Sequence, residues 1–264
     1  MKSLLLAAGL GTRLRPLTED WPKCLMPIHG RPLLEFWLGI LWRQGGGQVL
    51  VNMHYHADIV GEFLHRTQFQ GWVEPIYEEK LLGTAGTLRK NAGYFDREPV
   101  LVVHADNWSC CDFPAFIAYH QMKRPRGTLI TMMTFESPAP ESCGIVELND
   151  EGVVIGFHEK VKNPPSNLAN AAVYIIEPEV LSWMKEREEV VDLSTDVLPH
   201  FIGKIATWKN EMVHKDIGTV RMLVSAQCDT CTLPPWSGED EWQKEFAHNP
   251  IHVMLSSLES EYHG

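Results

Sequence analysis

The segment Leu4–Glu35 reads LLLAAGLGTRLRPLTEDWPKCLMPIHGRPLLE. Its apolar run leads directly into a turn that contains Gly9 and Gly11, and the cations Arg13 and Lys23 follow. A buried strand that ends in a glycine turn carries backbone N–H groups to the carboxyl edge of a parallel sheet, where open α/β sheets bind their ligands. The segment therefore predicts an anion-binding loop in an α/β fold.

Two familiar phosphate motifs do not match this loop. A P-loop requires Gly-Lys-Ser/Thr after its glycines, whereas the chain has Gly11-Thr12-Arg13. A dinucleotide fingerprint requires a third glycine, and Leu14 stands in its place. Isolated cations also occur in solvated loops, but two glycines, an arginine and a lysine together favour ligand phosphates.

Short apolar runs alternate with amphipathic segments as far as residue 125. This alternation is typical of parallel strands joined by crossover helices. It predicts a doubly wound, mostly parallel, Rossmann-like sheet. The predicted strands are 3–7, 48–53, 73–77 and 100–104, and the predicted helices are 33–42, 57–66, 84–92 and 113–123.

The second half of the chain is richer in strands, and no linker separates it from the first. We therefore expect one domain over residues 1–226, with halves 1–125 and 126–226. After residue 226 the periodicity fades, and 227–264 is predicted to be a C-terminal tail of unknown role. In the second half the predicted strands are 128–135, 144–148, 153–158, 171–176 and 205–208, and the predicted helices are 178–184 and 194–201.

Composition narrows the partners of the protein. A formal net charge of −11 argues against a nucleic-acid surface and against binding to anionic membranes. The six cysteines are too irregularly spaced for a disulfide framework, so a cytoplasmic location is expected. No run approaches the roughly 18 apolar residues of a membrane span. The negative net charge is compatible with a small phosphorylated ligand, because the binding of such a ligand depends on local cations.

The stretch LAAGLGTRLRPLTEDWPKCLMPI resembles the signature of the sugar-phosphate nucleotidylyltransferases, also called nucleoside-diphosphate-sugar pyrophosphorylases: G-x-G-T-R-x-x-P-x-T, then P-K, then a further proline. Later pieces follow in the family's order, so the resemblance covers roughly residues 1–226. These pieces are EEKLLGTAGTL at 78–88, LVVHADN at 101–107, FHEKVKNPP at 157–165, LANAAVYII at 168–176 and HKDIGT at 214–219.

The resemblance implies a glycosyltransferase-A-like nucleotidyltransferase fold with a strand-rich sugar-binding half. It also implies transfer of a nucleotidyl group from an NTP to a sugar 1-phosphate, with Mg²⁺ as cofactor. By the resemblance, Arg13 and Lys23 are catalytic, and Asp106 and Asp216 hold the metal. The implied nucleotide-binding residues are Ala7, Gly9, Gly11, Thr12, Gly83, Thr84 and Asn107. The implied sugar-phosphate-binding residues are Gly144, Glu159, Lys160 and Asn170.

Substrate choice is less defined by the sequence. The loop Gly83-Thr84-Ala85-Gly86 is similar to that of guanylyl-transferring members, so GTP with a mannose-like hexose or heptose 1-phosphate is favoured. The family often has glycine where this chain has Ala172, which weakens the sugar assignment. A uridylyl- or thymidylyltransferase of the same fold, a non-catalytic nucleotide-sugar-binding regulator, and a homo-oligomer stay open.

Overall fold

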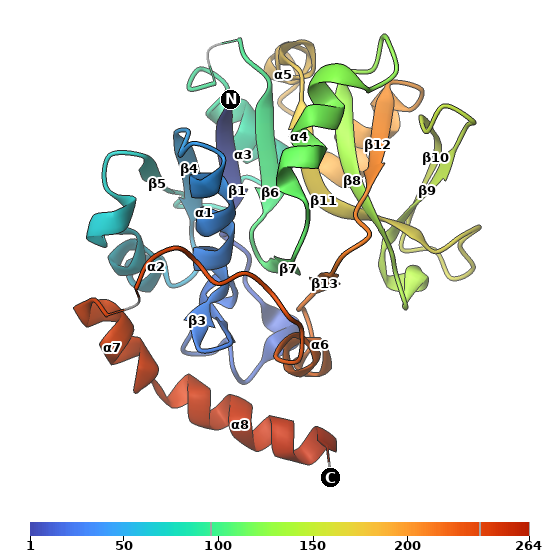
Figure 1. Cartoon of the computed structure of the whole chain (residues 1–264). Coiled ribbons are helices and arrows are strands. Elements are labelled where there is room, and N and C mark those ends of the chain that lie inside the picture. The colour runs from blue at the N-terminus through green and yellow to red at the C-terminus, as the bar shows by residue number, and fades with distance from the viewer. Residues whose placement is uncertain (96, 238, 264) are drawn as a thin grey trace. The chain divides into compact units, whose positions relative to one another are not determined.

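The computed structural model describes residues 1–95, 97–237 and 239–263 (Figure 1). The chain divides into two compact units that interleave along the sequence. Unit 1 comprises Met1–Leu4, Leu82–Val103 and Cys111–Met212, and unit 2 comprises Leu5–Leu81, His104–Cys110 and the chain from Val213 onward. Strand β1 (Lys2–Leu6) contributes residues to both units.

Unit 1 is built on a mixed sheet. Its strands follow the order β10-β9-β11-β6, with every neighbouring pair antiparallel, while β8 pairs antiparallel with β11 and parallel with β12. The bounds are β6 Val100–His104, β8 Ile130–Glu136, β9 Gly144–Leu148, β10 Val154–Glu159, β11 Leu168–Ile176 and β12 Ile205–Lys209. Its α-helices are α3 Thr84–Lys90, α4 Phe113–Met122 and α5 Pro178–Lys185.

Unit 2 carries the parallel pair β4–β5 and two short antiparallel pairs, β2–β3 and β7–β13. The bounds are β2 Pro27–Ile28, β3 Arg31–Pro32, β4 Val49–Met53, β5 Val73–Tyr77, β7 Asn107–Ser109 and β13 His214–Asp216. Its α-helices are α1 Leu33–Arg43, α2 Ala57–Leu64, α6 Val220–Ala226, α7 Glu241–Ala247 and α8 Pro250–His263.

Most elements lie within a few residues of their predicted bounds, because local apolar periodicity and caps define them. Strands β5, β6 and β9 have the predicted bounds, and Asp112 caps α4 by accepting a hydrogen bond from the Ala115 N–H. The helix predicted over 194–201 is present but is not an α-helix: Leu193–Val197 forms a π-helical turn and Leu198–Phe201 a 3₁₀ helix. Strands β7 and β13 are three residues long, too short for an alternation pattern.

The C-terminal tail contains the helices α7 and α8, and apolar side chains of both helices are buried within unit 2. Phe246 of α7 and Ile251 and Leu255 of α8 are buried in one apolar cluster with Leu14 and Ile217. Burying such side chains stabilises a fold by about 1.5–3 kcal/mol each. The tail sequence showed only weak periodicity because few of its side chains face this cluster; on α8, Val253 is 71% exposed.

Polar contacts also anchor the tail. In Figure 1 the segment between α6 and α7 runs across α1, where Pro234 and Pro235 pack against Gly39 of α1. The buried Arg66 forms an ion pair with Asp240, with Nη2 and Oδ2 2.6 Å apart. Asp240 also caps α7 by accepting a hydrogen bond from the Gln243 N–H. One side chain therefore both starts the helix and neutralises a buried cation.

No helix in the described ranges of the chain combines the length and the apolar character that crossing a bilayer requires.

We predict that Phe246→Ala lowers the free energy of unfolding by about 3–5 kcal/mol, because it leaves a cavity in the cluster. Val253→Ala is the matched control on the exposed face of α8, and its effect should stay within about 0.5 kcal/mol. Urea unfolding followed by tryptophan fluorescence measures both. Equal effects of the two variants would show that the tail does not contribute to the folded interior.

Candidate functional site

The glycine loop after β1 has a defined shape. Gly11 adopts φ +63°, in the left-handed region, and a β-carbon there would lie 2.8 Å from Cγ2 of Thr18. The Thr18 hydroxyl donates to the Gly11 carbonyl at 2.8 Å, and Thr18 is fully buried. A 3₁₀ helix, Thr12–Leu14, starts directly after this turn and carries Arg13. Only glycine combines this backbone geometry with such close packing.

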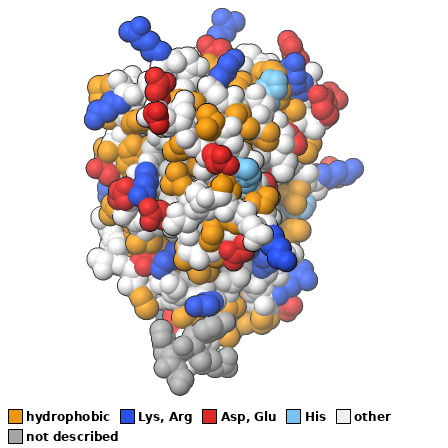
Figure 2. Space-filling view, turned by 90° about the vertical axis from the view of Figure 1, so that its right-hand side faces the viewer, with side chains coloured by type: hydrophobic (Ala, Val, Ile, Leu, Met, Phe, Trp, Pro, Cys, Tyr) orange, Lys and Arg blue, Asp and Glu red, His pale blue; other side chains and the backbone are white. Residues whose placement is uncertain are grey.

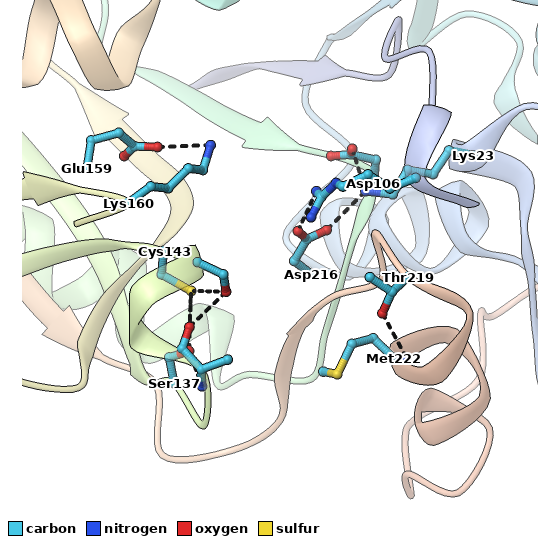
Figure 3. A network of polar contacts seen from close by, with 12 residues as sticks. Lys23, Asp106, Ser137, Cys143, Glu159, Lys160, Asp216, Thr219 and Met222 are labelled. Carbon is cyan, nitrogen blue, oxygen red and sulfur yellow. Dashed lines mark hydrogen bonds and ion pairs between the residues drawn. The ribbon is translucent and has the colours of Figure 1, made fainter. Parts of the chain in front are cut away.

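Arg13, Lys23, Asp106 and Asp216 form one cluster in unit 2 (Figure 3). The Lys23 ammonium Nζ donates to Asp106 Oδ2 at 2.8 Å and to Asp216 Oδ1 at 3.1 Å. Arg13 Nη2 donates to Asp216 Oδ2 at 2.9 Å. The sequence predicted all four residues for this site, and the structure brings them together within hydrogen-bonding distance.

The cluster has an uneven exposure. The side chain of Lys23 is 5% exposed, that of Asp216 is 45% exposed and that of Arg13 is 63% exposed. Burial alone would lower the pKa of Lys23, but the charges of Asp106 and Asp216 outweigh burial and raise it. Burial likewise would raise the pKa of Asp216, yet Lys23 and Arg13 lower it. Lys23 and Asp216 therefore both carry their charges at neutral pH.

Short strands deliver the two carboxylates. Asp106 follows β6, which ends at His104, and Asp216 is the last residue of β13. Strand β13 pairs with β7 so that Asp216 stands opposite Asn107. Gly218 leaves room for the cluster, since a β-carbon there would lie 2.5 Å from Arg13 Nη2 and 2.9 Å from Asp216 Oδ1.

A cavity of about 310 Å³ opens beside this cluster. Cationic, anionic and backbone groups all border it, which suits a ligand with several phosphates and a bound cation. Its lining residues are Leu10, Gly11, Thr12, Arg13, Lys23, Asp106 and Gly218. A second hollow, of about 390 Å³ beside α8, has no charged lining residue and does not suit a phosphate.

The two carboxylates fit a magnesium ion that also binds substrate phosphates. Their oxygen atoms are hard ligands, and both already share one positive charge, that of Lys23. Within the described ranges no group of three or more His, Cys, Asp or Glu side chains is placed to hold a metal. Mg²⁺ commonly takes one or two protein carboxylates and completes its octahedron with water and phosphate oxygens.

The predicted sugar-phosphate residues Gly144, Glu159 and Lys160 lie together in unit 1. Gly144 of β9 stands opposite Glu159 of β10, and a β-carbon on Gly144 would lie 2.7 Å from Glu159 Oε2. Lys160 follows β10 with φ +50°, and its Nζ lies 3.1 Å from Glu159 Oε1 (Figure 3). The missing side chain of Gly144 therefore makes room for the carboxylate, and the cation beside it is 67% exposed.

Asn170, also predicted to bind the sugar, makes internal hydrogen bonds. Its Nδ2 donates to the hydroxyl of the buried Tyr174 at 2.6 Å, and its Oδ1 accepts from the Ala172 N–H at 2.9 Å. Ala172 has φ +54°, a left-handed conformation that suits the glycine expected there. The amide of Asn170 thus supports an irregularity in β11, where the register with β8 shifts.

Gly83 and Thr84 are also held by contacts within unit 1. A β-carbon on Gly83, whose φ is +76°, would overlap the Val191 carbonyl oxygen. The Thr84 hydroxyl donates to Asp192 Oδ2 at 3.1 Å and accepts from the Leu193 N–H at 2.7 Å. These contacts fasten the start of α3 to the segment 190–193. The hydroxyl of Thr84 is therefore committed to the fold.

Sequence reasoning missed one side chain beside the glycine loop. Asn52 of β4 is 3% exposed, and its Oδ1 accepts from the Ala7 N–H at 2.7 Å. The predicted nucleotide residue Ala7 thus has its N–H engaged by a side chain. The available signal was a polar residue inside the apolar run Val49–Met53.

The face of the molecule in Figure 2 carries mixed charge. On the face in Figure 2, acidic and basic side chains of the described residues are interspersed, and no continuous basic stripe crosses that face.

The chain is similar in sequence to enzymes that act on sugar 1-phosphates. A mannose-1-phosphate guanylyltransferase from Mycobacterium tuberculosis is 28% identical, over 86% of this chain and 64% of its own length. A UTP–glucose-1-phosphate uridylyltransferase from Synechocystis is 32% identical, over 76% of this chain and 55% of its own length. The chain therefore spans only part of these relatives, 64% and 55% of their lengths.

A solved structure shows the same fold. A Bacillus anthracis protein, described as a glucose-1-phosphate thymidylyltransferase and crystallised with sucrose, superposes with a TM-score of 0.76 at 23% identity, over 86% of this chain and 94% of that one. This likeness confirms the predicted α/β fold class. A family model described as nucleotidyl transferase matches residues 2–232. Since that match covers most of the sequence, the chain belongs to the nucleotidyl transferase family.

Proposed function

We propose that this protein transfers a nucleotidyl group from an NTP to a sugar 1-phosphate, and that it releases an NDP-sugar and pyrophosphate. The observation that carries the proposal is the cluster of Arg13, Lys23, Asp106 and Asp216 beside the glycine loop. The family membership and the names of the relatives support it.

The proposed reaction does not require a general base. A sugar 1-phosphate oxygen attacks the α-phosphorus in line, the bond to the β-phosphate oxygen breaks, and pyrophosphate leaves with that electron pair. The attacking oxygen is already ionised, so no side chain has to remove a proton. Both reactants are anionic, and rate acceleration comes from positioning and charge neutralisation.

Two cations of the cluster suit these tasks. Lys23 is a nearly buried ammonium whose position is fixed by two carboxylates, so it is preorganised to neutralise the attacking phosphate and the α-phosphate. Arg13 is mostly exposed at the rim of the cavity, where its planar fork can hold the departing pyrophosphate. The glycine loop, through Gly9, Gly11 and Thr12, lines the phosphates.

Asp106 and Asp216 would hold Mg²⁺. A bound magnesium ion supplies charge neutralisation and orients the phosphates. Glu159 and Lys160 would contact the hydroxyls and phosphate of the sugar, with Gly144 giving close access. Asn170 is assigned an indirect part, because its amide hydrogen bonds are used within unit 1. A cytoplasmic location belongs to the proposal, supported by the irregular cysteine spacing.

The carboxylate of Glu78 favours guanine as the base of the nucleotide. Its side chain is 3% exposed, and Asn52 Nδ2 donates to its Oε1 at 3.1 Å, so the carboxylate is held in one orientation. Guanine presents N1–H and N2–H₂ donors on one edge, which a carboxylate accepts, whereas uracil and thymine present a single ring N–H. The relatives include both guanylyl- and uridylyltransferases, so a pyrimidine nucleotide is the second candidate.

With a mannose-type sugar 1-phosphate, we predict that GTP is preferred over UTP and dTTP by at least tenfold in kcat/KM. An acceptor left unpaired against a pyrimidine costs about 1–3 kcal/mol. Pyrophosphate release across four NTPs and a panel of sugar 1-phosphates measures the preference. Equal turnover with UTP would replace the guanylyl assignment. No turnover with any pair would favour a nucleotide-sugar-binding regulator.

Lys23→Ala should lower kcat/KM by about 10²–10⁴-fold, because the lost charge lies between groups that repel each other most during transfer. Lys209→Ala is the control: this lysine also pairs with acids, Glu136 and Glu211, but it belongs to unit 1 and forms no ion pair with the cluster. A loss below threefold for Lys23→Ala would remove it from the mechanism.

Asp106→Asn and Asp216→Asn should each raise the Mg²⁺ concentration needed for half-maximal rate. The loss of activity in the double variant should barely exceed that of the more impaired single variant, because both carboxylates bind the same ion. Asp229→Asn controls for loss of an ion-paired aspartate, since Asp229 pairs with Lys215 in the same unit. Fully additive losses would mean that the two carboxylates do not share a metal.

A further inference from the structure

Asn52 is an exception to the pattern of its strand. All five residues of β4 are buried, and the other four are Val49, Leu50, Val51 and Met53. A buried amide without partners would cost about 1–3 kcal/mol, so a polar side chain at this position requires a compensating set of hydrogen bonds.

Both ends of the Asn52 amide have partners in unit 2. Oδ1 accepts from the Ala7 N–H at 2.7 Å and from the Ala8 N–H at 3.3 Å. Nδ2 donates to Glu78 Oε1 at 3.1 Å. Because backbone N–H groups need an acceptor and a carboxylate needs a donor, only one orientation of the amide satisfies all three bonds.

These contacts reach two parts of the proposed nucleotide site. Ala7 and Ala8 are the first residues after β1 and lead directly into Gly9. Glu78 is the first residue after β5. A single rigid amide therefore joins the start of the phosphate loop to the carboxylate assigned to the base.

The far end of the loop is tied separately. The Thr18 hydroxyl donates to the Gly11 carbonyl at 2.8 Å. A loop with two free glycines would lose considerable entropy on ordering around a ligand. Because the tethers at Ala7–Ala8 and at Gly11 already order the loop during folding, less entropy is lost when a ligand binds. Such preorganisation raises the affinity for the ligand.

We propose that Asn52 is a positioning residue for the nucleotide: it fixes the entry of the glycine loop and the Glu78 carboxylate as one unit. Base recognition and phosphate binding are thereby coupled through one side chain. The proposal rests on the function proposed above. It predicts that Asn52 variants weaken nucleotide binding and leave the sugar 1-phosphate almost unaffected.

An exchange of hydrogen-bond direction tests the coupling. Asn52→Asp keeps the Oδ1 acceptor but sets a second carboxylate against Glu78, so it should raise KM and Kd for GTP at least tenfold. KM for the sugar 1-phosphate should change less than twofold, and kcat less than threefold. In the double variant with Glu78→Gln, the new amide donates to the new carboxylate, and Kd for GTP should recover at least fivefold relative to Asn52→Asp.

Controls separate this role from general stability. Asn210→Asp alters another buried asparagine, whose Oδ1 accepts from the Met212 N–H in unit 1, and it should leave KM for GTP within twofold. Glu78→Gln alone measures how much of the affinity for GTP depends on the Glu78 carboxylate. The double variant lacks this contribution too and cannot recover it. If Asn52→Asp does not fold, Asn52→Ser, which keeps a neutral acceptor, replaces it in the binding assays.

Hydrogen exchange measures the tether between Asn52 and the glycine loop independently of the reaction. Asn52→Ala, which removes the acceptor that Asn52→Asp and Asn52→Ser keep, should speed amide exchange in a peptide covering Ala7–Gly11 at least fivefold, whatever the protein catalyses. Unchanged exchange, or a GTP Kd within twofold of wild type, would overturn the positioning role. Accelerated exchange with no turnover by the wild-type protein would instead refute the proposed function and leave the tether standing.

Discussion

A buried ammonium group requires negative partners, and Lys23 has two, Asp106 and Asp216. The attraction outweighs the desolvation of the ammonium and keeps it charged. This requirement constrains the surrounding chain: the segment after the glycine loop must return to the end of β6, and β13 must align beside β7. The arrangement of unit 2 around the cavity depends on this ion cluster.

Other polar residues are used to build the fold around the sites. Thr84 holds α3 to the segment 190–193, and Asn170 supports the left-handed turn at Ala172. Such residues match a family motif while their polar atoms are already paired inside the protein. A residue that matches a family motif can therefore serve the backbone geometry as well as a ligand. The hydrogen bonds of its polar atoms distinguish these two roles.

The C-terminal tail illustrates a second constraint. Its apolar side chains join Leu14, next to Arg13, and Ile217, next to Asp216, in one buried cluster. The ion pair of Asp240 with Arg66 closes the same unit. Packing of the tail thus supports the segments that carry the charged cluster, although none of the tail residues that the structure describes lines the cavity.

The sequence by itself determined the strands and helices with strong periodicity, the glycine loop and the identity of its charged residues. These follow from local rules: alternation, caps, and the few residue types that bind phosphate. The domain division and the roles of the predicted site residues stay predictions, although the four charged ones do cluster. Tertiary structure alone decided the pairing of β7 with β13, the burial of the tail and the hydrogen bonds of Asn52 and Thr84. Each depends on segments far apart in the chain, and a short strand or a lone polar residue carries no local pattern that names its partner.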